Sequence, residues 1–516
     1  MGADLVKRDV FRFRAWQAAI LAVIFAMAFG CVRSGASWGS TGSYDPTTDP
    51  YSMQNITAAD GVQAWWNAGY TGKGVDVAVI DTGVAPVAGL SGSGKVVNGP
   101  DLSLESQNPS LQYLDTNGHG TFMAGLIAGN DGQAAGYRGV APDARIVSLK
   151  VGVADGGTDV SQVIAAIDWV VQHRNDNGLN IRVINLSYGT NSTQSYAIDP
   201  LAYAVEQAWK AGIVVVAAAG NSGFQKGSNA QGLADPAYDP QILAVGSADT
   251  MGTTAPWDDN VASFSASCNV GCRPPDLIAP GTHMQGLRVP GSYIDQNNPS
   301  GAISDQYFRG SGTSEATAFT SGAVADLLQR YPQLTPDQVK NMLTSSCDKL
   351  NSSNWKQQGC GELDMGRLLG ASVPSQSSSQ QSNAPSTGIG SLEASRGTDH
   401  ISINGAVLQG EQDIFGQRFV SPAMAALEAA GSSWSGGTWN GSSWSGNSWN
   451  GSSWSGSSWS GSSWSGSSWS GSSWSGNSWS GSSWSGSSWS GSSWSGSSWS
   501  GSSWSGGTWL GASWGR

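Results

Sequence analysis

The sequence is short of positive charge. Its 516 residues include 25 Lys and Arg against 37 Asp and Glu, which gives a formal net charge of −12 and a pI near 4.7. No basic stripe is present to neutralise phosphates, and this argues against nucleic acid as a partner. Histidine is also scarce, with four in the whole chain, so the candidates for a catalytic general base are few.

Apolar runs are short as well. The run over residues 15–29 follows four basic residues between positions 7 and 14. A basic region followed by an apolar region of this length predicts a secretory signal over residues 1–30, with a small-x-small cleavage site at residues 26–28. The run is short for a bilayer span of about 20 residues, so an uncleaved anchor ranks second. A lipoprotein modified at Cys31 ranks a distant third, because Ala28 rather than leucine stands three residues before it. We expect a secreted or cell-surface protein.

Cysteine is rare and paired in sequence. Besides Cys31 there are four cysteines, in two close pairs: Cys268 with Cys272, and Cys347 with Cys360. Four cysteines allow three connectivities, and local pairing is the simplest. A zinc site is the weaker alternative, because only His283 lies nearby and export favours disulfides.

Four glycine-containing segments carry the groups that nucleophilic catalysis needs. They are Val79-Ile80-Asp81-Thr82-Gly83, Asn117-Gly118-His119-Gly120-Thr121, Ala218-Ala219-Gly220-Asn221-Ser222 and Gly312-Thr313-Ser314-Glu315-Ala316-Thr317-Ala318. A serine needs an adjacent base, the base needs a carboxylate, and the oxyanion needs preformed donors. The order Asp, His, Ser is one of three unrelated orders in which this triad occurs. On these motifs the chain resembles the subtilisin-type serine peptidases (subtilases, family S8).

The resemblance implies a role for each motif. Asp81 would orient the imidazole of His119, which would act as general base and then acid for the nucleophile Ser314. Asn221 would donate to the oxyanion beside the backbone N–H of Ser314. The implied activity is that of a secreted serine endopeptidase acting on proteins or peptides, with no organic cofactor. His173 we expect on a helix surface, and His283 and His400 have no comparable sequence frame.

Substrate contacts follow from the same resemblance. Ser187, Tyr188 and Gly189 would form the edge that pairs with an extended substrate, so that main-chain bonds bind and pockets select. Ala218 and Gly220 would form the opposite wall of the pocket for the residue before the cleaved bond. Asp235-Pro236-Ala237 resembles the pocket floor. The small residues suggest a pocket open to medium or large apolar side chains.

Glu315 departs from the family pattern, because many subtilisins carry methionine after the nucleophile. A glutamate removes an oxidisable thioether beside Ser314. It also places a carboxylate near the site, which is expected to raise the pKa of His119. We predict oxidant tolerance and an activity profile shifted upward in pH.

Two further departures concern the propeptide and calcium. Between the signal and the domain-like sequence that begins by residues 51–66, too little chain remains for a sizeable chaperone propeptide. Folding without one, or with help in trans, stays open. Calcium is unassigned: no DxDxDG-like loop is present, and Asp101, Glu105 and Asp115 are candidates among many pairs.

Composition divides the chain into six parts. Signal or anchor (1–30) and a short linker (31–50) precede a peptidase domain over residues 51–370, where apolar strand-like runs alternate with helix-like stretches. This alternation predicts an α/β fold with three layers and a mostly parallel central sheet. Residues 371–400 are rich in Ser, Gln and Pro, which is typical of a flexible linker. Residues 401–430 form a short ordered-looking segment of unknown role.

Residues 431–516 repeat Gly-Ser-Ser-Trp-Ser with tryptophan at every fifth position, and Arg516 is the only charged residue there. A period of five fits neither a helix nor a strand. The alternatives are a four-sided β-solenoid and a disordered chain with spaced aromatic residues; we favour disorder or marginal order. The tail could contact a cell surface or polysaccharide, drive self-assembly, or act as an inert spacer.

Two other functions compete with a general endopeptidase. One is a surface-adhesion or assembly protein whose protease domain is inactive or processes only itself. The other is a maturation protease with few substrates. Nothing that the chemistry requires is missing from the motifs, and this favours an active enzyme.

Overall fold

The structure of the protein is a computed structural model. It describes residues 44–433, except 109, 134–135, 226–231, 269–270, 352–353, 404–405 and 415–417, and short backbone strands between residues 462 and 514. These strands are β18 (Ser462–Ser465), β19 (Ser473–Ser478), β20 (Gly481–Ser482), β21 (Trp504–Ser505), β22 (Thr508–Trp509) and β23 (Gly511–Trp514). The signal or anchor at 1–30 and the Cys31 alternative lie outside the described residues, as does the repeat tail apart from these strands. Within the described part, no helix combines the length and the apolar character that a membrane crossing requires.

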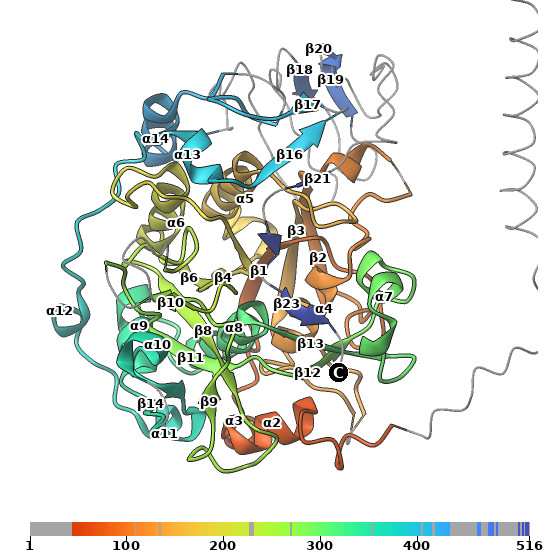
Figure 1. Ribbon diagram of the computed structural model, residues 1–516, viewed down its shortest axis with the longest axis vertical. Helices are drawn as coiled ribbons and strands as arrows, with labels where there is room; N and C mark the ends of the chain where they lie inside the picture. Colours follow the sequence, from red (N-terminus) through yellow and green to blue (C-terminus); the bar gives the residue numbers. More distant parts are fainter. Residues whose placement is uncertain are drawn as a thin grey trace, which may run out of the picture. The chain divides into compact units, whose positions relative to one another are not determined.

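A mostly parallel sheet forms the centre of the peptidase domain (Figure 1). Across the sheet the strands are β2 (Val96–Asp101), β3 (Arg145–Lys150), β1 (Asp76–Asp81), β4 (Ile181–Leu186), β6 (Val214–Ala218), β8 (Leu243–Asp249), β11 (Leu277–Pro280), β15 (Glu362–Leu363) and β14 (Cys347–Asp348). The pairings from β2 to β15 are parallel, and β14 pairs antiparallel with β15, as β9 (Asn260–Val261) does with β8. The inner strands are continuous apolar runs buried on both faces, as parallel sheets require.

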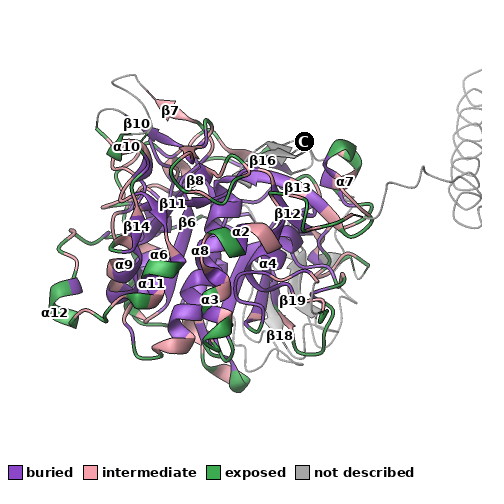
Figure 2. Cartoon of the chain, turned by 90° about the horizontal axis from the view of Figure 1, so that it is seen from below, coloured by how far each residue is buried: buried purple, intermediate pink, exposed green. Residues whose placement is uncertain are grey.

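Helices cover both faces of this sheet, so the predicted three-layer α/β fold is confirmed. On one face α4 (His119–Ala128) packs against α8 (Thr313–Arg330); on the other α5 (Val160–His173) packs against α6 (Pro200–Lys210). Figure 2 shows α4 and α8 almost entirely in the colour of buried residues. Every residue of α4 is buried, as is α8 from its first residue to Leu328. Therefore α4, which begins with His119, and α8, which carries Ser314, are both core helices.

Local sequence signals set the ends of the outer helices. Asp159 caps α5, accepting from Ser161 N–H, and Gln162 completes a capping box. Asp199 caps α6, whose first residue is Pro200, a favoured residue at that position. The helix-like stretch of sequence over residues 160–173 forms α5, and the apolar run over residues 75–80 forms β1 within one residue.

Smaller elements complete the domain. They are α2 (Met53–Ala59), α3 (Val62–Asn67), β5 (Tyr188–Gly189), β7 (Phe224–Gln225), β10 (Ser267–Cys268), β12 (Met284–Leu287), β13 (Tyr307–Gly312), α7 (Tyr293–Asn297), α9 (Pro336–Thr344), α10 (Trp355–Gln358), α11 (Met365–Gly370) and 3₁₀ turns at Leu104–Gln107, Asp176–Gly178 and Pro299–Gly301. The antiparallel pair β12 and β13 leads directly into α8. This pair therefore precedes the segment that carries Ser314.

His173 lies at the end of α5 and is buried, so the prediction of a surface histidine was wrong. Its ring stacks on Trp169 with centroids 4.4 Å apart, and its Nδ1 lies 2.8 Å from a carboxylate oxygen of Asp176. The sequence pattern did not reveal this, because the ring is covered by a tryptophan four residues earlier on the same helix face.

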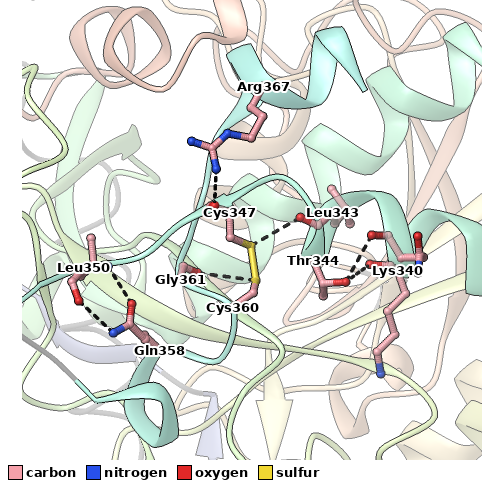
Figure 3. Close-up of a disulfide and its surroundings, with 10 residues drawn as sticks. Lys340, Leu343, Thr344, Cys347, Leu350, Gln358, Cys360, Gly361 and Arg367 are labelled. Carbon is pink, nitrogen blue, oxygen red and sulfur yellow. Dashed lines mark hydrogen bonds between the residues drawn. A yellow bond between two sulfur atoms is a disulfide. The ribbon is translucent and has the colours of Figure 1, made fainter. Parts of the chain in front are cut away.

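Both disulfides join the cysteines that are close in sequence, Cys268 with Cys272 and Cys347 with Cys360, as predicted. The second links β14 to the turn before β15 (Figure 3). Around it, Arg367 donates to the Cys347 carbonyl at 2.6 Å, and Gln358 bonds both backbone groups of Leu350. The disulfide therefore ties an otherwise polar loop to the edge of the sheet.

The chain beyond residue 370 lies along the domain. Its elements are α12 (Gln376–Ser379), α13 (Leu392–Arg396), β16 (His400–Ile403), β17 (Ala406–Val407) and α14 (Ser421–Ala429). In Figure 1 this part is coloured teal to blue; α13 and α14 lie against α5 and α6, whereas α12 contacts α9. Gln381 donates to the Gln241 carbonyl at 2.8 Å, and Ser386 N–H to Glu206 at 2.7 Å. Composition predicted a flexible linker over 371–400; these contacts describe a segment held by hydrogen bonds instead.

Candidate active site

Asp81 and His119 meet at the carboxyl edge of the central sheet. Asp81 is the last residue of β1, and His119 is the first residue of α4. The imidazole Nδ1 lies 2.8 Å from Asp81 Oδ1 and 2.9 Å from Oδ2, and both residues are buried. Asp81 Oδ1 also accepts from Thr82 N–H at 2.7 Å. The carboxylate is thus placed to hold the imidazole with its proton on Nδ1.

Glycine at position 120 is what lets α4 approach β1 this closely. A Cβ on Gly120 would lie 2.2 Å from the Gly83 carbonyl oxygen and 3.0 Å from Asp81 Oδ1. Any side chain there would push the start of α4 away from the strand end and from the carboxylate that His119 contacts.

Asp115 organises the turn that carries His119. Its carboxylate accepts from the N–H groups of Asn117 at 3.1 Å, Gly118 at 2.7 Å and Thr121 at 2.8 Å, and from the Thr121 hydroxyl at 2.6 Å. Thr82 Oγ1 also donates to it at 2.8 Å, which links the turn to the residue after Asp81. From the sequence, Asp115 was predicted only as a calcium candidate. An acidic residue four positions before a histidine at a predicted helix start was the available signal.

Ser314 lies in the first turn of α8, at the same edge of the sheet. The residue is buried, and its hydroxyl donates to the Ser187 carbonyl at 3.4 Å, while Ser187 Oγ donates to the Ser314 carbonyl at 3.2 Å. The helix N-terminus directs backbone N–H groups toward this point, where negative charge is favoured. Ser314 is thereby tied to the segment expected to bind substrate.

Asn221 is oriented by its neighbour Thr313. The side-chain oxygen of Asn221 accepts from the N–H and from the hydroxyl of Thr313, both at 3.0 Å. Gly220 N–H in turn donates to Thr313 Oγ1 at 3.2 Å. Because Oδ1 is held in this way, donation from Asn221 to an oxyanion beside Ser314 would come from Nδ2.

The expected substrate segments are brought together as well. Leu186, before Ser187, pairs with Ala217 in the register of β4 and β6, which sets β5 beside Ala218 and Gly220. Thr190 follows β5 and exchanges two backbone hydrogen bonds of 3.0 Å with Asp235, next to the Pro236-Ala237 segment. The Tyr188 side chain is fully buried, and its backbone pairs with Trp509 of β22, so a substrate would have to take the place of β22 along this edge.

Burial and neighbouring carboxylates set the protonation of the site. Burial lowers the pKa of His119, but the Asp81 carboxylate, followed by Glu315 and Asp115, raises it above the ordinary value. Burial raises the pKa of Asp81, against the opposing effect of His119. Glu315 is fully buried, and burial raises its pKa to about 7. The effect of Glu315 on His119 has the direction expected from the sequence.

The three calcium candidates are occupied by protein groups. Asp101 accepts from the backbone and hydroxyl of Ser103, and Glu105 pairs with the buried Lys150 at 2.9 Å. Asp115 already has the donors described above. Across the described residues, no group of three or more His, Cys, Asp or Glu side chains is placed to hold a metal ion. Calcium therefore stays unassigned.

Comparison with known proteins agrees with this arrangement. The Subtilase family model (Peptidase_S8) matches residues 72–361. Serine protease AprX of Bacillus subtilis is 38% identical over 300 residues, 57% of this chain and 66% of AprX. Subtilisin DY of Bacillus licheniformis is 36% identical over 313 residues, 60% of this chain and 96% of that protein. Minor extracellular protease Epr of Bacillus subtilis is 30% identical over 312 residues, 60% of this chain and 41% of Epr.

The matched region contains every residue of the site described above, from Asp81 to Ser314. More than half of the chain is covered, and the relatives include a subtilisin that is matched over nearly its whole length. The chain belongs to the subtilase family of serine-type endopeptidases.

Proposed function

We propose that the protein is a secreted endopeptidase that hydrolyses peptide bonds through Asp81, His119 and Ser314. The observation that carries the proposal is the buried contact of His119 Nδ1 with both oxygens of Asp81, at the sheet edge where α8 presents Ser314. A buried carboxylate in this contact has a catalytic use, because it stabilises the imidazolium that forms during proton transfer.

The proposed reaction proceeds by acyl transfer. Ser314 Oγ attacks the carbonyl carbon of the scissile bond while His119 Nε2 takes the hydroxyl proton. The electron pair of the C=O bond moves to the oxygen, where Asn221 Nδ2 and the Ser314 N–H donate to it. When the carbonyl re-forms, the C–N bond breaks and the amine leaves with the proton from His119. Water, deprotonated by His119, then attacks the acyl-enzyme in the same way and releases the acid.

The proposed substrate is an extended protein or peptide chain. The backbone of β5 at Tyr188 and Gly189 would pair with it, and the wall formed by Ala218 and Gly220 would admit the side chain before the cleaved bond. The small residues of this wall support a preference for medium or large apolar side chains.

Secretion is supported by the predicted signal over residues 1–30 and by the two disulfides, which form and persist in oxidising environments. The name of the relative Epr describes that protein as extracellular. For the repeat tail over 431–516 we propose contact with a cell surface or polysaccharide, since the faces of its tryptophans can stack on sugars. A chain truncated after residue 430 should then lose retention on insoluble polysaccharide and keep its hydrolytic activity.

The test of the proposed reaction is hydrolysis of casein and of a chromogenic peptide series, with Ser314→Ala as the matched variant. We expect activity in the wild type and its loss in the variant, by roughly 10⁶-fold in kcat, a magnitude taken from subtilisin and not from this chain. If a folded wild-type protein cleaves nothing, the active-enzyme proposal fails and an adhesion or assembly role takes its place. Cleavage of one partner only would favour a maturation protease.

A further inference from the structure

Residues 386–398, which we name the brace, run along the loop formed by residues 190–199 between β5 and α6. Two backbone bonds join them: Thr387 N–H donates to the Ala197 carbonyl at 2.8 Å, and Gly390 N–H donates to the Ile198 carbonyl at 2.6 Å. The Thr190 hydroxyl donates to the Ser395 carbonyl near the other end of the brace. The brace therefore contacts both ends of the loop, at Thr190 and at residues 197–198.

Gln194 is the central side-chain link between the two segments. Its Nε2 lies within hydrogen-bonding distance of the Ser391 carbonyl (2.8 Å), of Ser395 Oγ (3.0 Å) and of the Asp199 carboxylate (2.6 Å). Its Oε1 accepts from Ser391 N–H at 3.1 Å. One side chain thus joins the middle of the loop to two residues of the brace.

The brace is itself anchored by Arg396, which has no exposed side-chain surface. The guanidinium lies 2.6 Å from Asp159, the cap of α5, and donates to the Gly410 carbonyl at 2.7 Å. Glu393 lies 3.2 Å from the same guanidinium. A buried charge with these partners holds its position closely, so the brace is a fixed support rather than a loose cover.

The loop that the brace supports begins where the proposed substrate edge ends. Thr190 directly follows β5, bonds the brace through its hydroxyl, and pairs through its backbone with Asp235. Thr190 therefore connects the loop directly to Gly189 and Tyr188, and a displacement of Thr190 would change the position of this edge. Binding by strand addition gains most from an edge that is already ordered, because ordering it on binding costs free energy.

We propose that the brace is a positioning element for the substrate-binding edge, so that a segment outside the matched family region helps to set affinity for extended substrates. The inference rests on the proposed function, because it needs β5 to bind substrate. The brace takes no part in the chemistry at Ser314. Loosening it should weaken binding along β5 and leave acyl transfer intact.

The test uses Gln194→Ala in the full chain, with Gln381→Ala as the matched control. Gln381 also ties the extension to the domain, donating to the Gln241 carbonyl at 2.8 Å and to Asp337 at 2.9 Å. Neither of these partners belongs to the loop of residues 190–199. Two substrates are compared: a chromogenic peptide with four residues before the cleaved bond, and an ester of a single amino acid, which does not extend along β5. For Gln194→Ala we expect KM for the peptide to rise about tenfold with kcat unchanged, and the ester kinetics to stay constant.

A peptide KM that rises equally in both variants would overturn the proposal, as would an ester rate that falls together with the peptide rate. A second readout does not depend on catalysis: amide hydrogen exchange at Tyr188, Gly189 and Thr190 should increase in Gln194→Ala and not in Gln381→Ala. Unchanged exchange would also overturn it. If the wild type hydrolyses neither substrate, the proposed function fails, and the exchange measurement still decides whether the brace orders this edge.

Discussion

The peptidase core and the C-terminal extension over residues 371–433 are held together by different forces. In the core, apolar strands such as β1 and β6 are buried on both faces and pack against the buried helices α4 and α8. The extension up to residue 398 is attached mainly through polar groups, with Gln381, Ser386 and Arg396 each bonded to the core. A segment with few apolar residues can be ordered when a folded surface supplies a partner for each polar group.

The extension is not polar throughout. Ile401, Leu408 and Ile414 form a small apolar cluster with Leu104 and Val153 of the core. This cluster follows the brace in sequence. Polar attachment therefore dominates the stretch with linker-like composition, and apolar packing resumes in the segment that looked ordered from its sequence.

The attachment of the extension to the core should be weakened most by a substitution at Arg396. We expect Arg396→Ala to lower the free energy of unfolding by about 3–5 kcal/mol, because the variant leaves Asp159 buried without its cation. Urea unfolding measures the change. Arg367→Ala is the control in the core: its side chain is half exposed, and its carboxylate partners are partly exposed, so the expected loss is about 1 kcal/mol or less. Equal small losses would mean that the extension does not contribute to the stability of the domain.

The prediction for Asn221 concerns catalytic rate and not stability, because Asn221 is a core residue that does not attach the extension. We expect Asn221→Ala to lower kcat by about 10²–10³-fold, a magnitude borrowed from subtilisin, with little change in KM. The reason is that the amide donates to charge that exists only in the transition state. Steady-state kinetics on the chromogenic peptide measure both constants. A rise in KM with kcat preserved would show that Asn221 binds the ground state instead.

Among the variants tested by rate, Glu315→Gln has the smallest expected effect. Glu315 is a buried carboxyl whose own side chain bonds no other described residue. Above pH 7 its ionised form raises the pKa of His119. Removing that charge with Glu315→Gln should move the acid limb of the kcat/KM profile to lower pH. An acid limb at the same pH in both proteins would contradict this coupling.

The Glu315 carboxyl also makes the stability of the fold depend on pH. Burial raises the pKa of Glu315 from 4.5 to about 7, so the folded state holds its proton more tightly than the unfolded state. Stability is then lost as pH rises from about 4.5 through 7, by an amount on the order of 3 kcal/mol. Glu315→Gln should flatten this loss, which thermal unfolding between pH 5 and pH 9 would measure. Equal pH dependence in the two proteins would exclude it.

Much of the core could be predicted, because its signals are local or periodic. The apolar run that forms β1 and the helix-like stretch that forms α5 match those elements within one residue. The four short motifs place Asp81, His119, Ser314 and Asn221 in the order that the family requires. What could not be predicted depends on partners distant in sequence. Gln194, for example, bonds a residue almost 200 positions away.

From the sequence by itself the α/β core, the simplest disulfide pairing and the candidate catalytic residues could be predicted, since apolar periodicity and glycine-bounded motifs act over a few residues. Only the tertiary structure decided the roles of Asp115, which collects five donors around the His119 turn, and of residues 371–400, which lie against the domain. The physical reason is that a polar side chain has no preferred partner in the sequence. Whether it faces water or is bonded depends on which donors and acceptors the folded chain brings within about 3 Å.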